Sequence, residues 1–127
     1  PPDPSIPAEL FRHNVEAGDV VLIVTGYIPP VMDDAFPQFV TLMDEAAEFL
    51  ATLPVRAYGT DGFSVGGPNE TSTSGSHYSF LSRTIPVYEQ LLNVEKLLGK
   101  ENLFFVGVPL NINKGDGILV RPVVFIY

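Results

Sequence analysis

Blocks of apolar residues divide the chain into segments that each have the length of one secondary-structure element. Residues 20–24 are apolar at every position and rich in β-branched side chains, which is typical of a strand covered on both faces. From 36 to 50, apolar residues recur at intervals of three and four, which predicts an amphipathic helix capped by Asp33 or Asp34. A second, shorter strand is predicted over 55–61. A strand, a helix and a strand in this order indicate a βαβ unit with parallel strands.

The remaining segments are shorter or less regular. Residues 8–16 are predicted to form a short helix with Leu10, Phe11 and Val15 facing inward. The other predicted segments are a long polar loop at 62–76, one or two helical turns at 78–83, an extended segment at 85–91, a short helix at 93–99, and two strands at 103–112 and 118–127 joined by a hairpin-type turn at 114–117.

Length and composition restrict the class of protein. With 127 residues the chain has the size of one domain, and 46% hydrophobic residues are enough for a core. The formal net charge of −8 argues against binding to nucleic acid or to an anionic membrane surface, and it favours a small-molecule or protein partner. The chain has no cysteine, so neither a disulfide framework nor thiolate chemistry is expected.

The first seven residues are rich in proline. They predict an extended linker over 1–7, followed by one domain over 8–127. The sequence begins with neither an initiator methionine nor a signal peptide, which favours a precursor that has been cut before Pro1. The triplet Asn69-Glu70-Thr71 would accept an N-linked glycan in a secreted protein, so secretion and a cytoplasmic location both stay open.

Two residues suggest metal chemistry. His77 is one of two histidines, and Glu89 interrupts an apolar run over 85–92. A carboxylate in such a run is costly to bury unless a partner pairs with it, and imidazole together with carboxylate suits zinc or a similar divalent ion. The hypothesis is that His77 and Glu89 bind one metal ion. The alternative is an ordinary hydrogen-bonded histidine and a solvent-facing glutamate, because the spacing is unspecific and catalytic zinc usually takes three protein ligands.

Asp61 ends the second predicted strand of the βαβ unit. Ligand sites in parallel sheets collect at the carboxyl ends of strands, which favours a place for Asp61 at the site, although an aspartate before Gly62 is equally typical of a turn. A Ser-His-Asp site can be drawn from Ser76, His77 and Asp61, but no nucleophile-elbow motif supports it. Residues 59–67 also lack the glycine spacing of a dinucleotide-binding loop.

Four segments follow one another in an order that is informative. They are Gly18-Asp-Val-Val-Leu-Ile-Val-Thr-Gly26, Ala57-Tyr-Gly-Thr-Asp61 with Gly62-Phe-Ser64, the stretch from His77 through Ile85-Pro86 and Glu89 to Asn93, and Phe105-Val-Gly-Val-Pro-Leu110 with Val120-Arg-Pro-Val123. Together they resemble the carboxyl-terminal half of the cyclase family, the metal-dependent hydrolases that include bacterial kynurenine formamidase and isatin hydrolase. The resemblance covers nearly all of the chain after its proline-rich start.

The resemblance implies an α/β protein with the swivelling β/β/α cyclase-like fold, in which a mixed sheet and flanking helices are completed by a missing N-terminal segment. It also implies that His77 and Glu89 are the family's late histidine and glutamate at the metal centre, with His77 taking part in catalysis and Asp61 supporting the site. The ion would be Zn²⁺ or Mn²⁺, and metal-activated water would attack an amide or lactam carbonyl. The family's upstream motif, His-x-Gly-Thr-His-x-Asp-x-Pro-x-His, is absent, and His13 stands in a different context.

The partners implied are therefore an N-terminal fragment of the same precursor, a small amide or lactam substrate and further copies of the chain, since family members commonly form dimers or tetramers. The alternative is a non-catalytic cyclase-like binding or structural protein that has lost the metal site. The presence of His77 and Glu89 favours the hydrolase, whereas the missing upstream motif fits both interpretations.

Overall fold

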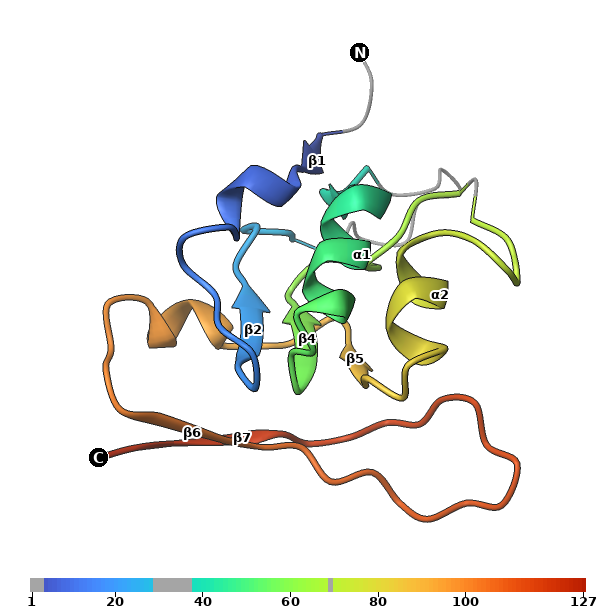
Figure 1. Ribbon diagram of the computed structural model, residues 1–127. Helices are drawn as coiled ribbons and strands as arrows, with labels where there is room; N and C mark the ends of the chain where they lie inside the picture. Colours follow the sequence, from blue (N-terminus) through green and yellow to red (C-terminus); the bar gives the residue numbers. More distant parts are fainter. Residues whose placement is uncertain (1–3, 29–37, 69) are drawn as a thin grey trace. The chain divides into compact units, whose positions relative to one another are not determined.

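The computed structural model describes residues 4–28, 38–68 and 70–127 (Figure 1). The chain divides into two compact units, Pro1–Lys96 and Leu97–Tyr127, which are described separately. Within the described residues, no helix has both the length and the apolar character needed to span a membrane.

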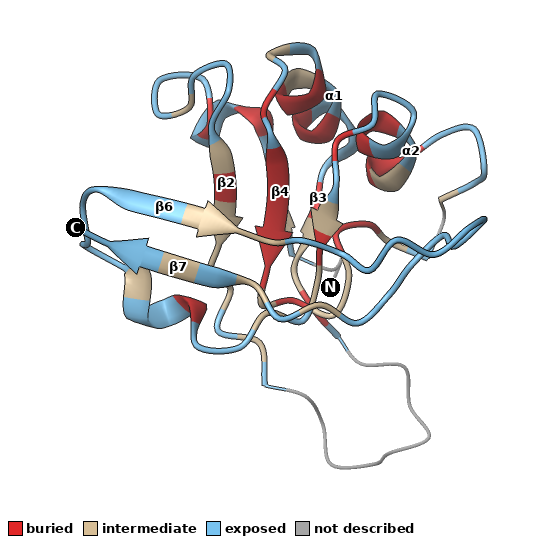
Figure 2. Cartoon of the chain, turned by 90° about the horizontal axis from the view of Figure 1, so that it is seen from below, coloured by how far each residue is buried: buried red, intermediate tan, exposed pale blue. Residues whose placement is uncertain are grey.

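The first unit is built on a three-stranded sheet with the order β2 (Val20–Ile23), β4 (Ala57–Thr60) and β5 (Val87–Tyr88). Both pairs are parallel, with Val20 opposite Ala57 and Gly59 opposite Tyr88, so the predicted βαβ unit is confirmed. All four residues of β4 are buried, as the red colour of this strand in Figure 2 shows. In β2, by contrast, only Val21 is buried. The prediction of a strand covered on both faces is therefore wrong for β2, because it lies at the edge of this sheet.

The helix between β2 and β4 is α1 (Asp44–Thr52), which buries Ala46, Ala47, Leu50 and Ala51. It starts later than predicted, because the backbone of residues 41–43 pairs with other segments. Thr41–Leu42 form strand β3, which is parallel to β1 (Ser5–Ile6), and the Leu42 N–H donates to the Val65 carbonyl oxygen at 2.8 Å. The expected caps Asp33 and Asp34 lie outside the described residues.

The N-terminal segment also differs from its prediction. Ser5–Ile6, expected to belong to a linker, are extended and form β1. The helix expected over 8–16 is a 3₁₀ helix, η1 (Ala8–Leu10), followed by turns. Phe11 is buried, as predicted, but Leu10 is 53% exposed and does not face inward. With three residues per turn, a 3₁₀ helix brings Ala8 and Phe11 to the same side, and Leu10 lies off that side.

Helix α2 (Ser76–Leu81) lies beside α1 and covers the same sheet (Figure 1). Its Phe80 is fully buried and stacks on Tyr58 of β4, with ring centroids 5.3 Å apart. The segment after α2 runs through β5 and ends in the 3₁₀ helix η2 (Val94–Leu97). The helical turns predicted at 78–83 are confirmed by α2, which places His77 on a helix that is anchored in the core. The extended segment predicted at 85–91 is a strand only at Val87–Tyr88, since Gln90 has a φ angle of +55°, and the helix predicted at 93–99 is the 3₁₀ helix η2.

The second unit is an antiparallel pair, β6 (Leu103–Val106) and β7 (Val123–Ile126), in which Leu103 is opposite Ile126. The predicted pairing direction is confirmed, but each strand is shorter than predicted. The ladder stops at Val123, directly after Pro122, because proline has no N–H to donate to a neighbouring strand.

Candidate metal centre

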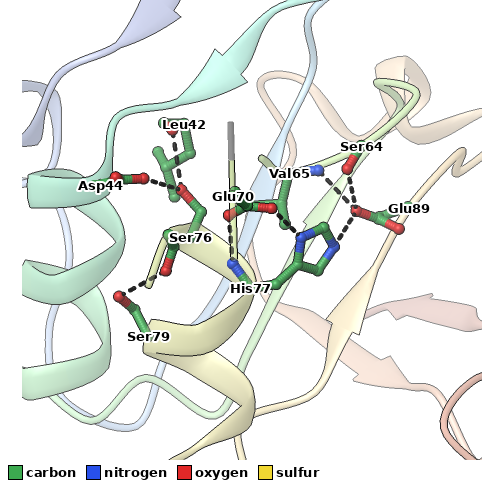
Figure 3. Close-up of polar contacts among 10 residues, drawn as sticks. Leu42, Asp44, Ser64, Val65, Glu70, Ser76, His77, Ser79 and Glu89 are labelled. Carbon is green, nitrogen blue, oxygen red and sulfur yellow. Dashed lines mark hydrogen bonds and ion pairs between the residues drawn. The ribbon is translucent and has the colours of Figure 1, made fainter. Parts of the chain in front are cut away.

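His77 and Glu89 meet in the first unit, although they come from different elements. His77 lies in the first turn of α2, and Glu89 directly follows β5. The Nε2 atom of His77 is 3.0 Å from Oε1 of Glu89 (Figure 3). The side chain of His77 is 36% exposed and that of Glu89 is 30% exposed, so both remain partly open to solvent. The two residues singled out in the sequence therefore form one polar centre.

Glu89 is also held by the loop that follows β4, through the same oxygen that contacts His77. Its Oε1 atom accepts hydrogen bonds from the Val65 N–H at 2.7 Å and from the Ser64 hydroxyl at 3.1 Å. Burial alone would raise the pKa of the Glu89 carboxyl, but the hydrogen bonds from His77, Val65 and Ser64 hold this pKa below its ordinary value. Glu89 is therefore an ionised carboxylate at neutral pH.

The opposite edge of the His77 ring faces Glu70. Nδ1 of His77 is 2.5 Å from Oε2 of Glu70, and the backbone N–H of His77 donates to Oε1 of the same carboxylate at 2.9 Å. The hydrogen bond with Glu89 raises the pKa of His77 most, burial opposes this change, and Glu70 adds to the rise, so that the pKa reaches about 9. The sequence analysis did not identify Glu70 as a site residue.

The donor set suits a divalent ion. The raised pKa keeps both ring nitrogens of His77 protonated at neutral pH, so that Nδ1–H faces Glu70 and Nε2–H donates to Glu89. A divalent ion would take the place of the Nε2 proton, because a metal binds the deprotonated nitrogen. One imidazole nitrogen and one carboxylate group are ligands that both zinc and manganese accept. Among the described residues, however, no group of three or more His, Cys, Asp and Glu side chains is arranged to hold a metal ion. His77 and Glu89 thus fit as two ligands of an ion that needs further ligands.

Asp61 lies at the carboxyl end of β4, and its carboxylate binds the loop that follows β2. Oδ1 accepts hydrogen bonds from the N–H and the hydroxyl of Thr25, at 2.7 and 2.6 Å, and Oδ2 accepts one from the Gly26 N–H at 2.8 Å. Burial would raise the pKa of Asp61, but these hydrogen bonds lower it below the ordinary value. Asp61 therefore fixes the loop that follows β2 to the end of β4.

The Ser-His-Asp arrangement drawn from the sequence does not assemble. The Ser76 hydroxyl is buried and donates to the Leu42 carbonyl oxygen at 3.0 Å, on the α1 side of α2. In Figure 3 it lies apart from the imidazole of His77, and Asp61 is bonded to Thr25 and Gly26. His13, the other histidine, lies in an exposed turn. The glycosylation triplet begins at Asn69, which lies outside the described residues.

Comparisons with known proteins support the fold. No family model matches the sequence, and no curated protein matches it. Among solved structures, the chain is similar to one described as a potential metal-dependent hydrolase with cyclase activity. The TM-score is 0.68 and the sequences are 22% identical over 96% of this chain, which spans 58% of that protein. The chain therefore has a mixed α/β fold similar to that of this protein, as predicted from the resemblance.

Proposed function

We propose that this chain is part of a metal-dependent hydrolase that cleaves the C–N bond of an amide or lactam, with His77 and Glu89 as two ligands of a Zn²⁺ or Mn²⁺ ion. The observation that carries the proposal is the 3.0 Å approach of His77 Nε2 to Glu89 Oε1, two side chains brought together from α2 and from the end of β5. A fold similar to that of a potential metal-dependent hydrolase with cyclase activity supports it.

The residues around the centre have separable roles in this proposal. The Val65 N–H and the Ser64 hydroxyl keep Glu89 ionised and oriented toward His77. His77 offers Nε2, and its exposed fraction leaves the centre open to a small substrate. When bound, a divalent ion of this kind lowers the pKa of a coordinated water and polarises a carbonyl group. Asp61 supports the site by fixing the loop at Thr25, next to the carboxyl ends of the strands.

The remaining ligands are proposed to come from a second polypeptide, an N-terminal fragment of the same precursor. Two observations support this step. The described residues provide no third ligand beside His77 and Glu89, and the similar hydrolase is longer than the segment that matches this chain. Assembly with further copies of the chain is proposed from the family resemblance alone.

A non-catalytic cyclase-like protein is the second candidate. The observation in its favour is the absence, among the described residues, of any three-ligand group. In this case His77 and Glu89 are an ion pair that connects α2 to the end of β5, and the fold serves binding or structure. The two candidates differ in whether the purified protein holds metal, and in whether a partner polypeptide carries the upstream histidines.

The test combines denaturing mass spectrometry of the purified protein with metal analysis of wild type, His77→Ala, Glu89→Ala and His13→Ala. The hydrolase proposal expects a second polypeptide that carries the His-x-Gly-Thr-His motif and about one ion per pair of chains. His77→Ala and Glu89→Ala are expected to lose this ion, whereas His13→Ala, which removes an exposed histidine, keeps it. Metal-free wild type, or metal that survives both ligand substitutions, would exclude the proposed centre and leave the non-catalytic candidate.

A further inference from the structure

Glu70, the third charged residue at this centre, comes from the long polar loop before α2. Its side chain is 17% exposed, less than that of either His77 or Glu89. Both of its carboxylate oxygens bind the same residue, since Oε1 accepts from the backbone N–H of His77 and Oε2 contacts Nδ1 of the ring (Figure 3). A carboxylate attached at two points to one histidine restricts both the backbone and the ring of that residue.

Two glycines make room for Glu70. A Cβ atom at Gly66 would overlap the Glu70 carboxylate, and a Cβ atom at Gly75 would lie 2.5 Å from Glu70 Cγ. Gly75 also has a φ angle of +107°, which L side chains rarely adopt, and it immediately precedes α2. At Gly67, in contrast, an added Cβ would meet nothing within 4 Å. The loop therefore has glycines at the positions that would otherwise exclude the Glu70 side chain.

We infer that Glu70 is a positioning residue for His77: it binds the Nδ1–H of the ring and thereby directs Nε2 toward Glu89, the orientation in which Nε2 would bind the proposed ion. Histidines that bind metals usually donate their other ring N–H to a carboxylate or a carbonyl, and this bond fixes the tautomer and the orientation of the ring. The metal-binding part of the inference rests on the proposed function. The control of the ring by Glu70 is a property of the protein without metal as well.

A purely structural role for Glu70 makes a different prediction. If the carboxylate served only to bind the backbone N–H at the start of α2, the loss of this carboxylate would change neither the protonation of Nδ1 nor the orientation of the His77 ring. Glu70→Gln separates the two roles, because glutamine keeps the length of the side chain and an oxygen for the backbone N–H. Its amide cannot offer two carboxylate oxygens to His77, so the contact with Nδ1 is altered while the loop is preserved.

The first measurement is nuclear magnetic resonance of the ¹⁵N-labelled imidazole of His77 in the metal-free protein. We expect wild type to show an Nδ1–H proton that is shifted downfield and protected from exchange with solvent. Glu70→Gln and Glu70→Ala are expected to lose this protected signal. Glu95→Gln is the matched control, because it removes one carboxylate from η2 and is expected to leave the signal unchanged.

The second measurement is the affinity of the same proteins for Zn²⁺ and Mn²⁺ by titration calorimetry. Loss of the carboxylate that orients a ligating histidine typically weakens metal binding by about 10–100-fold, and we expect this range for both Glu70 variants. Gly66→Ala tests the same point without changing Glu70 itself, because the added methyl group displaces the carboxylate. It is expected to reproduce the loss of signal and of affinity, whereas Gly67→Ala behaves like wild type.

The outcomes separate this inference from the proposed function. If wild type binds no metal but the Glu70 variants lose the Nδ1–H signal, the metal centre is excluded and the control of the ring by Glu70 stands. If wild type binds metal and Glu70→Gln and Gly66→Ala leave both the signal and the affinity unchanged, the positioning role is overturned and the metal centre stands. Circular dichroism of each variant shows whether a loss of signal or of metal affinity reflects unfolding. If the other variants unfold, the result for Glu70→Gln, which is closest in shape to wild type, decides whether Glu70 positions the ring.

Discussion

Two carboxylates lie at the carboxyl ends of neighbouring parallel strands, and they are held in different ways. Asp61 follows β4 and accepts hydrogen bonds from the backbone N–H groups of Thr25 and Gly26 and from the Thr25 hydroxyl. Glu89 follows β5 and has, besides Ser64 and Val65, an imidazole as its partner. The backbone N–H groups that bind Asp61 have no free lone pair and cannot be metal ligands, whereas an imidazole nitrogen can be one.

This difference in hydrogen-bond partners is the reason for proposing Glu89, and not Asp61, as a metal ligand. Satisfying a carboxylate with backbone donors builds a fixed connection between two loops, and here it joins the end of β2 to the end of β4. Satisfying it with a histidine leaves a pair whose members can both turn to a third partner. The position at a strand end is common to both residues, so position alone does not identify a ligand; the chemical nature of the partner does.

The largest effect on stability is expected for Asp61→Asn. The amide keeps the shape of the side chain but loses the charge and one acceptor oxygen, so the bonds to Thr25 and Gly26 are weakened together. Hydrogen bonds to charged groups contribute about 1.5–3 kcal/mol, and because Asp61 is partly exposed we expect a loss of about 2 kcal/mol in the free energy of unfolding. Urea denaturation measures this loss.

Metal binding by Asp61→Asn tests whether Asp61 and Glu89 have separate roles. Its affinity for Zn²⁺ and Mn²⁺ is expected to stay within the range of wild type, while Glu89→Ala loses binding. A loss of metal in Asp61→Asn, at a temperature where the variant remains folded, would contradict the separate roles and show that metal binding depends on Asp61.

A smaller effect is expected for Gly59→Ala, in β4, the strand that Asp61 follows. The added Cβ would lie 2.6 Å from Leu22 Cδ2 and 2.9 Å from Leu91 Cδ1, one on β2 and the other just beyond Glu89. Because both atoms are the ends of flexible side chains, we expect a cost of about 1 kcal/mol, at the low end for an overfilled core. Urea denaturation measures this cost, and Gly67→Ala is the control because an added Cβ there meets nothing within 4 Å. Equal stability of the two variants would show that β4 has more room than the structure indicates.

The sequence predicted the βαβ unit because its signals are local. The apolar run at 20–24 and the strand ending at Asp61 identified β2 and β4, and their order implied parallel pairing. The start of α1 was missed, although Pro37 within the predicted helix was a signal against helix in that segment. The periodicity of 36–50 did not reveal β3, because two-residue strands are defined by their partners and not by a pattern.

The candidate site was predictable in part. His77 and Glu89 were identified by residue type and context, and the structure brings them together. Glu70 was missed because it lies in a polar loop without periodicity, where its neighbours in sequence do not indicate its contacts. The signal that was available is the glycines at 66 and 75 on both sides of one acidic residue, since glycine marks positions where another group approaches the backbone closely. Whether these residues bind metal stays a prediction.

The smallest effect concerns the pH dependence of stability, and it follows from the lowered pKa of Asp61. The pKa of Asp61 is lower in the folded protein than in the unfolded chain, where aspartate has a pKa of about 3.9. As the pH falls, the unfolded state therefore takes up the proton before the folded state does. The contribution of Asp61 is therefore complete above the unfolded pKa and is lost as the pH falls through the folded one. We expect the difference in unfolding free energy between wild type and Asp61→Asn to be constant near neutral pH and to shrink below about pH 4. Urea denaturation of both proteins at a series of pH values measures it. A difference that stays constant down to the lowest pH tested would contradict this. It would mean that the charge of Asp61 adds nothing to the free energy of unfolding, and that the connection between the loop after β2 and the end of β4 depends on the shape of the side chain alone.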